Sequence, residues 1–402
     1  MAVLVHCDEP TTASLSSIDT VRVVGWAISD DEPIARVRIT VNGQAQTDAA
    51  YGYPRPDVAR TYPHTLCALR SGFVAFARTP GLRPGRNVVA VEPSTIHGRR
   101  KVLEIAFDWC PMDVSEPDSC PACGDAPVAQ DATHGSMRLY ECPGCGLGFM
   151  WPLPSQFELA RYYNEEYKGT EDARRMAHEH PLHSDAPYLG GLLREAVGND
   201  ALIYDIGAGV GSLANGLRKE GFAVRAWDLG KASVEAARSI LGVDMQHGAL
   251  RDVRGDPADA IVLRHVIEHS PTPIQDIRHA VGLLRPGGAL LLVTPNFDSL
   301  AASVTGAYWE WFIPPAHLFY FTEAAIYAAA KAAGASVAYV KTRRGDANPM
   351  EVELAALLRT LPTGRHKAEL RILAGLGTRV DGRAAIDASG AGEELVALLL
   401  RA

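Results

Sequence analysis

The first 111 residues contain short apolar runs that are rich in β-branched side chains and end at turn signals. These runs cover residues 21–28, 34–41 and 87–91. Asn42-Gly43 and Arg83-Pro84-Gly85 lie between them, and such sequences favour reversal of the chain. Residues 101–107 alternate apolar and polar side chains, as a strand with one buried face does. The pattern predicts a small antiparallel β-sandwich for residues 1–111.

The pattern changes at residue 151, where helical stretches begin to alternate with short apolar strands. We expect strands at residues 202–206, 223–227, 260–263 and 289–294, and a final pair at 336–341 and 394–400. This alternation is typical of βαβ units around a parallel sheet, and it predicts an α/β domain over residues 151–402. Residues 350 to about 385 are expected to be helical and to form an inserted cap.

Composition and charge exclude several classes of protein. The chain has 402 residues with 39 Lys+Arg and 47 Asp+Glu, giving a net charge of −8, and this length predicts two or three domains. No run of about 18 apolar residues occurs and the first residues lack a secretory signal, so we expect a cytoplasmic protein without a membrane span. The acidic balance argues against nucleic-acid binding, which depends on basic residues. The oligomeric state is left open.

Four of the seven cysteines lie between the two regions, in residues 112–150. Cys120-Pro-Ala-Cys123-Gly and Cys142-Pro-Gly-Cys145-Gly form two Cys-x-x-Cys turns with 18 residues between them. Two such turns close a tetrahedral site with four thiolate ligands, so the spacing predicts a structural zinc ribbon. The alternative is a redox Cys-x-x-Cys pair. The remaining cysteines are expected to be buried small apolar residues: Cys7, Cys67 and Cys110.

A glycine-rich turn follows the first strand of the α/β region. The segment reads Leu202-Ile-Tyr-Asp205-Ile-Gly207-Ala-Gly209-Val-Gly211 and is followed by an expected helix from residue 212 to about 220. Glycines allow close approach of a ligand to the backbone, and the helix N-terminus offers free N–H groups. The second strand ends at Asp228, 17 residues after Gly211, where an acid can accept hydrogen bonds from ribose hydroxyls.

These motifs resemble those of the class I S-adenosylmethionine-dependent methyltransferases over residues 150–402, and they are most similar to the ubiquinone-biosynthesis-like group. The shared features include the Arg-Pro-Gly287-Gly288 turn before the fifth strand. Three further segments match that group in order and spacing: His265-Val-Ile-Glu268-His269, Thr294-Pro-Asn296, and residues 309–321 with His317. The resemblance implies a Rossmann-like, seven-stranded methyltransferase domain. The competing NAD-binding fingerprint requires a different glycine spacing.

The resemblance also implies the residues that bind S-adenosylmethionine. Asp205 and the three glycines would line its methionine end, and Asp228 would hold the ribose. The adenine would lie against Leu229, Ala249 and Leu250, with His265 nearby. Tyr163, together with Tyr162 and Tyr167, is similar to an aromatic lid over the cofactor; packing of an amphipathic helix on the sheet is an equally good interpretation.

Methyl transfer from a sulfonium requires alignment and, for a hydroxyl acceptor, removal of a proton. His317 is one candidate for the general base, and His269 oriented by Glu268 is the other. A third interpretation places a divalent cation at Glu268 and His269, with His265 as a further ligand. Trp309, Trp311 and Phe312 either shape an apolar acceptor pocket or belong to the core.

The N-terminal region resembles the Ig-like accessory sandwiches found beside some bacterial glycan-modifying enzymes. The resemblance rests on Gly25-Trp-Ala, Arg55-Pro-Asp57-Val and Gly72-Phe73. It implies either a glycan-recognition module or a packing domain without a ligand.

The favoured function is O-methylation of a saccharide or secondary-metabolite hydroxyl, with a small-molecule or glycan acceptor. The alternatives are C- or N-methylation of a deoxysugar or small metabolite, and a non-catalytic binding protein.

Overall fold

The computed structural model describes residues 3–10, 14–17, 20–46, 48–53, 55–65, 67–78, 81–111, 115–134, 137–154, 170–306, 309, 311–343 and 386–401. The expected cap at 350–385 and the tyrosines at 162, 163 and 167 therefore lie outside the described residues. In the described part of the chain, no helix is long and apolar enough to span a membrane.

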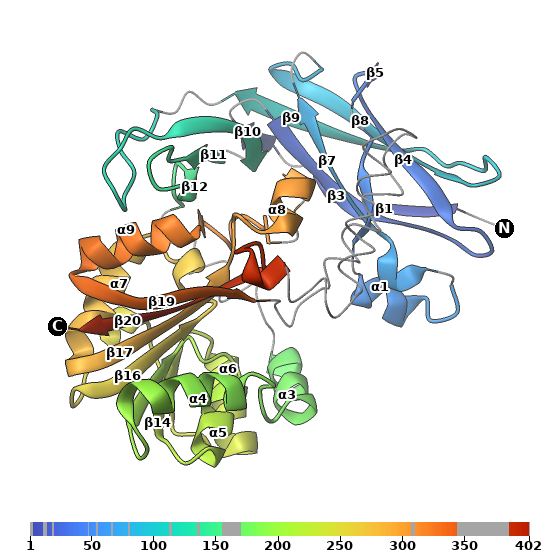
Figure 1. The fold of residues 1–402 in the computed structure, drawn as a ribbon. Helices are drawn as coiled ribbons and strands as arrows, with labels where there is room; N and C mark the ends of the chain where they lie inside the picture. Colours follow the sequence, from blue (N-terminus) through green and yellow to red (C-terminus); the bar gives the residue numbers. More distant parts are fainter. Residues whose placement is uncertain are drawn as a thin grey trace.

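The N-terminal region folds into two β-sheets that share one core (Figure 1). One sheet has the order β1(Val3–Glu9), β3(Thr20–Ser29), β7(Gly72–Arg78) and β6(Ala50–Tyr53). The other has the order β2(Ser14–Ser17), β9(Leu103–Pro111), β8(Gly85–Thr95), β4(Ile34–Val41) and β5(Gln44–Ala45). Val23 and Phe73 from the first sheet and Ile39 and Val89 from the second are fully buried in this core. The strands expected from the apolar runs are all present, and α1(Pro56–Thr61) and η1(Ala68–Arg70) connect β6 to β7.

A further four-stranded sheet packs against both the sandwich and the α/β region. It contains β10(Val128–His134), β11(Met137–Glu141) and β12(Gly148–Trp151), and its fourth strand is β18(Phe319–Tyr320). The ribbon sheet therefore takes one strand from a segment far along the chain. Phe76 of the sandwich lies in the same buried cluster as Leu139 of the ribbon, so the ribbon packs against both neighbours.

The α/β region contains a twisted sheet with the order β15, β14, β13, β16, β17, β20, β19 in the described part of the chain. Its strands are β13(Leu202–Ile206), β14(Ala223–Asp228), β15(Met245–His247), β16(Ala258–Arg264), β17(Leu284–Pro295), β19(Ala335–Arg343) and β20(Glu394–Arg401). The first five in this order are parallel, and β20 is antiparallel to both β17 and β19. This confirms the expected parallel sheet and its final strand pair.

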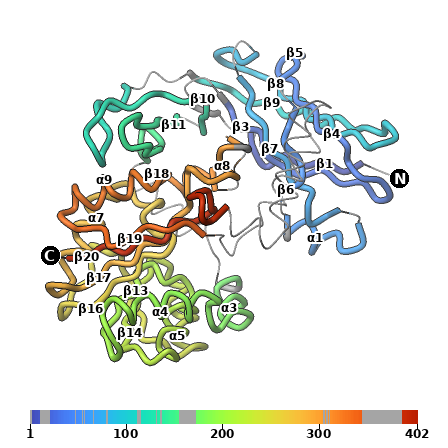
Figure 2. The backbone as a smooth tube through the Cα atoms, in the orientation of Figure 1, coloured from blue at the N-terminus to red at the C-terminus, as the bar shows by residue number. Residues whose placement is uncertain are grey.

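Helices cover both faces of this sheet. Its helices and turns are α3(Thr170–Glu179), α4(Ala186–Val197), α5(Ser212–Lys219), α6(Lys231–Ala236), η3(Ala237–Leu241), η4(Leu250–Asp252), η5(Ile267–His269), α7(Pro273–Leu283), α8(Leu300–Thr305) and α9(Glu323–Ala333). Val262 and Leu291 pack with α4 and α5 on one face, whereas Ile261 and Leu292 pack with α7 and α9 on the other. This alternation is the period of two that a strand buried on both faces requires, and Figure 2 shows the two layers.

Candidate active site

The glycine-rich turn lies between β13 and α5, at the carboxyl edge of the sheet. Gly207, Gly209 and Gly211 have φ values of +73°, +57° and +83°, which only glycine adopts readily. The N–H of Gly207 donates to the carbonyl of Trp227 at 2.8 Å, so the turn is fixed to β14. A Cβ atom on Gly207 would lie 2.5 Å from a methyl group of Val266, but one on Gly209 would meet open space. The turn is thus packed on one side and open at Gly209.

Asp228 lies at the end of β14, directly beside this turn. One of its carboxylate oxygens accepts a hydrogen bond from the N–H of Gly209, and the other accepts one from the N–H of Gly230, both at 2.8 Å. These backbone donors orient the carboxylate toward the open side of the glycine turn. The structure therefore brings Gly209 and Asp228 together, as the sequence predicts.

The residues expected to contact adenine follow β14 and β15. Asp228 pairs with His247 in parallel register, so Leu229 and the segment from Ala249 to Leu250 leave the sheet at the same edge. The Leu229 side chain is 49% exposed, and Leu250 is buried. The N–H of Ala249 is satisfied by the Asp252 carboxylate at 2.9 Å.

Asp205 occupies the buried end of β13, with 2% exposure. Burial raises the pKa of this carboxyl group to about 7, and the charge of Asp228 adds to the shift, while Arg264 opposes it. Its Oδ2 atom has no hydrogen-bond partner among the described residues. A buried carboxylate oxygen without a donor is costly, and a ligand that carries an N–H group or a positive charge would satisfy it.

His265 follows β16 in a left-handed conformation with a φ of +51°. Its Nδ1 lies 3.1 Å from a carboxylate oxygen of Glu268, and its Nε2 lies 2.9 Å from one of Glu394. Burial alone would lower the pKa of this histidine, but the two carboxylates outweigh burial and raise it to about 9. His265 is therefore an imidazolium that donates through both nitrogens, and it has no lone pair with which to bind a metal.

The ion pairs of His265 extend into a buried charge network that sequence reasoning missed. Arg343 donates to Glu394 at 2.8 and 3.0 Å and to Asp185 at 2.7 Å. Arg264 donates to the same aspartate at 3.2 Å. Asp185 precedes α4, Arg264 ends β16, Arg343 ends β19 and Glu394 begins β20. The network thus joins four elements along the carboxyl edge of the sheet.

Three aromatic rings are stacked beside this network. The Trp311 ring lies between His265 and His317, with centroid distances of 5.3 and 5.6 Å and interplanar angles of 8° and 6°. The Nδ1 of His317 donates to the Trp311 carbonyl at 2.9 Å, which leaves its Nε2 with a lone pair. His317 is 2% exposed. Burial and the neighbouring His269 lower the pKa of His317 to about 3, so its ring is neutral at working pH.

The structure brings the two predicted base candidates together. The rings of His269 and His317 meet edge to face at 4.6 Å, and the Nδ1 of His269 lies 2.8 Å from the carbonyl of Ala316. Glu268 is 1% exposed; burial would raise its pKa, but hydrogen bonding to His265 and nearby histidines lower it to about 2. The Glu268 carboxylate is hydrogen-bonded to His265 and Thr294, whereas its interaction with His269 is electrostatic. Candidate ligand atoms of Glu268, His269 and His317 lie within 4.8 Å of one another.

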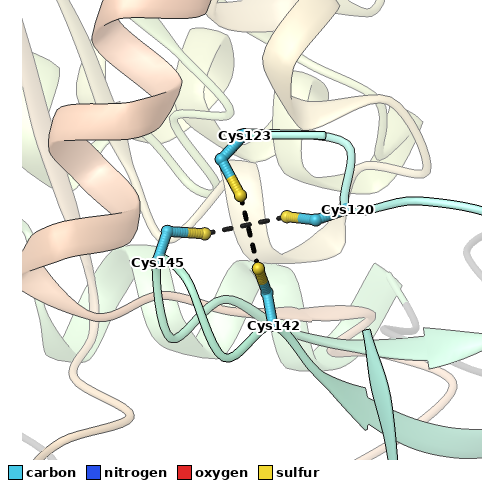
Figure 3. A group of neighbouring side chains, drawn as sticks. All are labelled: Cys120, Cys123, Cys142 and Cys145. Atoms are coloured by element: carbon cyan, nitrogen blue, oxygen red, sulfur yellow. Dashed lines mark hydrogen bonds between the residues drawn. The ribbon is translucent and has the colours of Figure 1, made fainter. Parts of the chain in front are cut away.

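The four ribbon cysteines point toward a common centre (Figure 3). Their sulfur atoms lie within 4.8 Å of one another, with separations of 3.7 Å for Cys120 and Cys145 and 3.3 Å for Cys123 and Cys142. A tetrahedral zinc with bonds of about 2.3 Å would place its sulfurs about 3.8 Å apart. The N–H of Gly124 donates to the carbonyl of Cys120, and the N–H of Gly146 donates to the carbonyl of Cys142. The residues present therefore fit a closed zinc site with four thiolate ligands.

The other predicted residues divide between the core and the surface. Trp309 and Phe312 are buried in the main hydrophobic cluster, and Trp311 packs against it, which favours the core interpretation for the first two. The expected burial of Cys67 and Cys110 is wrong, because both are exposed. Cys67 lies in a left-handed turn before η1, and its position in a loop overrides the burial preference of a free thiol.

The N-terminal motifs have clear structural roles. A Cβ atom on Gly25 would collide with the backbone of His6, so this position lets β1 and β3 pair closely. Arg55 donates to both carboxylate oxygens of Asp57, at 2.9 and 2.6 Å, and to Asp8 at 2.6 Å. These contacts fix the start of α1 against β1, as a packing domain requires. Recognition of a glycan stays a prediction.

The sheet is parallel except at β20, which lies between β17 and β19 and is antiparallel to both. Together with the glycine turn, this arrangement defines the class I methyltransferase fold in the α/β region. Residues 192–340 match the model of a family described as a methyltransferase domain. This stretch includes the glycine turn, Asp228 and the histidine cluster. The chain therefore contains a class I methyltransferase domain.

Curated relatives agree with this assignment. The chain is 33% identical over 141 residues to the ubiquinone biosynthesis O-methyltransferase of Xanthomonas axonopodis pv. citri, covering 32% of this chain and 58% of that protein. It is 33% identical over 139 residues to the enzyme of the same name from Xylella fastidiosa, covering 32% and 56%. The chain thus spans just over half the length of these relatives. A solved magnesium protoporphyrin IX methyltransferase from Synechocystis PCC 6803 is 17% identical, covering 61% and 94%, with a TM-score of 0.37.

We expect His265→Gln to destabilise the fold by about 3 kcal/mol at pH 7, because Glu268 would remain buried without its cationic hydrogen-bond partner, while Glu394 would keep only Arg343. The folded-state pKa is raised to about 9, so the stabilisation is fully present below pH 6.5 and is lost as the pH rises through 9. Urea unfolding of both proteins from pH 6 to pH 10 measures this difference. The control is His97→Gln, which removes an exposed pair with Glu32 and should change little. An equal loss at every pH would contradict the imidazolium assignment.

Proposed function

We propose that the chain transfers a methyl group from S-adenosylmethionine to a hydroxyl group of a small-molecule or glycan acceptor. The observation that carries the proposal is the convergence of the open side of Gly209, the oriented carboxylate of Asp228 and the unsatisfied oxygen of Asp205 at one edge of the sheet. Asp228 would accept hydrogen bonds from the ribose, and Asp205 would accept one from the α-ammonium group. Leu229, Ala249 and Leu250 would contact the adenine. Bound S-adenosylmethionine supplies an activated methyl group.

His317 is suited to accept the acceptor's proton. It is neutral, its tautomer is fixed by the Trp311 carbonyl, and its burial keeps water away from the reacting groups. A low pKa makes it a weak base, but the methyl donor is already activated, and the charge of Glu268 opposes the shift and would stabilise the imidazolium that forms. His269, whose ring meets that of His317 edge to face, is the second candidate base.

O-methylation is favoured over C- or N-methylation by the curated relatives, whose names describe them as O-methyltransferases. A saccharide or secondary-metabolite hydroxyl remains the proposed acceptor. The four ribbon cysteines would hold one structural zinc ion, and a reducing cytoplasm would keep their thiols available for it.

A second candidate mechanism uses a divalent cation at Glu268, His269 and His317. It is favoured because their candidate ligand atoms lie within 4.8 Å of one another. Each of the three side chains also has a hydrogen-bond partner outside this group, which is typical of metal ligands. Metal analysis distinguishes the two mechanisms. One zinc per chain with full turnover supports the histidine base, whereas a second bound metal that is required for turnover supports the cation.

Asp228→Asn should weaken S-adenosylmethionine binding about 10- to 100-fold, because hydrogen bonds to a charged group contribute about 1.5–3 kcal/mol. Isothermal titration calorimetry measures the affinity. Asp256→Asn is the matched control, since this carboxylate is exposed and only weakly paired with Arg225. Unchanged affinity of the Asp228 variant would contradict the proposed ribose contact.

His317→Gln should reduce turnover about 10²–10⁴-fold, the usual contribution of a general base, while leaving cofactor affinity within about twofold of the parent. A screen of hydroxylated acceptors with radiolabelled methyl donor provides the assay. Full turnover by the variant would remove His317 from this role.

The pH dependence of kcat/KM in the parent tests the same assignment. Because the pKa of His317 is lowered to about 3, its neutral form persists well below pH 6.5. We therefore expect no loss of activity from this residue between pH 8 and pH 5. An acidic limb with an apparent pKa near 6.5 that His317→Gln abolishes would contradict the lowered pKa.

A further inference from the structure

The backbone that carries His317 is held between the ribbon and the active site. On one side, the N–H of Met150 in β12 donates to the carbonyl of Leu318 at 2.8 Å. On the other side, the N–H of Leu318 donates to the carbonyl of Glu268 at 2.7 Å. The next two residues form β18, which pairs antiparallel with β12. The residue after His317 is thus hydrogen-bonded to both the ribbon and the active site.

A second connection runs directly to one of the zinc-site cysteines. The hydroxyl of Thr322 donates to the carbonyl of Cys145 at 2.8 Å and accepts from the N–H of Ala325 at 3.0 Å, capping α9. A Cβ atom on Gly146 would lie 3.0 Å from the Thr322 side chain. The second cysteine turn therefore packs closely against the end of the segment that contains His317.

The side chains of the two strands form one buried layer. The rings of Phe149 and Phe319 stack at 5.9 Å, with an interplanar angle of 20°, and both are 2% exposed. They belong to the same buried cluster as Cys120, Cys142 and Cys145. The ribbon is too small to have a core of its own, so a metal that holds its turns together also stabilises this shared layer.

We propose that the four-cysteine ribbon is a positioning element of the active site: the ribbon fixes β12, β12 fixes β18, and β18 fixes the backbone next to His317. A strand of two residues such as β18 is too short to be stable without its partner. This proposal rests on one part of the proposed function, the catalytic role of His317. Zinc in the ribbon therefore governs where the His317 ring lies, and the ribbon contributes to turnover without contacting the acceptor.

The test measures the accessibility of His317 with and without zinc in the full-length protein. Diethyl pyrocarbonate modifies accessible neutral histidines, and peptide mass mapping reports each residue separately. After zinc is removed by a chelator, we expect modification of His317 to rise at least about tenfold through local opening, and re-addition of zinc to reverse it. His6, whose side chain is 60% exposed, should react in both states. His265, held by the charge network, should remain protected in both.

Two further measurements show that the effect is local. S-adenosylmethionine affinity should stay within about twofold, because β13 and β14 lie outside the ribbon, whereas turnover should fall with the loss of His317 protection. Unchanged protection of His317 without zinc would overturn the proposal. Joint loss of His265 protection and cofactor affinity would also overturn it, because the whole domain would then have opened.

A substitution tests the same connection in zinc-loaded protein. Thr322→Val removes the hydrogen bond to Cys145 and should raise His317 modification about fivefold, while Thr322→Ser should restore protection. Thr61→Val is the matched control, since its hydroxyl also donates to a backbone carbonyl, in α1. Equal effects of Thr322→Val and Thr61→Val would overturn the proposal. If zinc-loaded protein protects His317 but methylates no acceptor, the proposed function fails while the positioning by the ribbon stands.

Discussion

The ion pairs of His265 with Glu268 and Glu394 are the interactions on which the carboxyl edge of the sheet depends. Two carboxylates that are each 1% exposed would repel each other and bear a large desolvation cost without a cation between them. The imidazolium compensates both. It also presents its face to Trp311, whose carbonyl sets the tautomer of His317. One buried positive charge thus organises the residues on the acceptor side of the proposed reaction.

The two sides of the carboxyl edge have different electrostatic characters. On the cofactor side, Asp205 retains an unsatisfied oxygen and a raised pKa, which is unfavourable until a positively charged ligand binds. On the acceptor side, the charges of Glu268, Glu394 and Asp185 are paired with basic residues. A buried carboxylate oxygen that lacks a donor beside the glycine turn is suited to a sulfonium donor with an α-ammonium group.

Much of the fold could be predicted because its signals are local. The alternation of strands and helices, the glycine turn and the cysteine pairs all depend on spacings of a few residues. The charge network could not be predicted in this way, since Asp185 and Arg343 are 158 positions apart and meet only when β19 joins the sheet. The pairing of β18 with the ribbon is equally long-range. The sequence suggests that Glu268 orients His269, whereas its hydrogen bonds join it to His265 and Thr294, because the left-handed turn at His265 brings that ring back over η5.

The most direct test of the account is a crystal structure of the protein bound to S-adenosylhomocysteine, with the position of the sulfur atom as the measured quantity. We expect the ribose at Asp228, the amino group at Asp205, and the sulfur on the side where His317 and His269 lie. A nucleoside bound away from Gly209, or a sulfur separated from both histidines by the sheet, would contradict it.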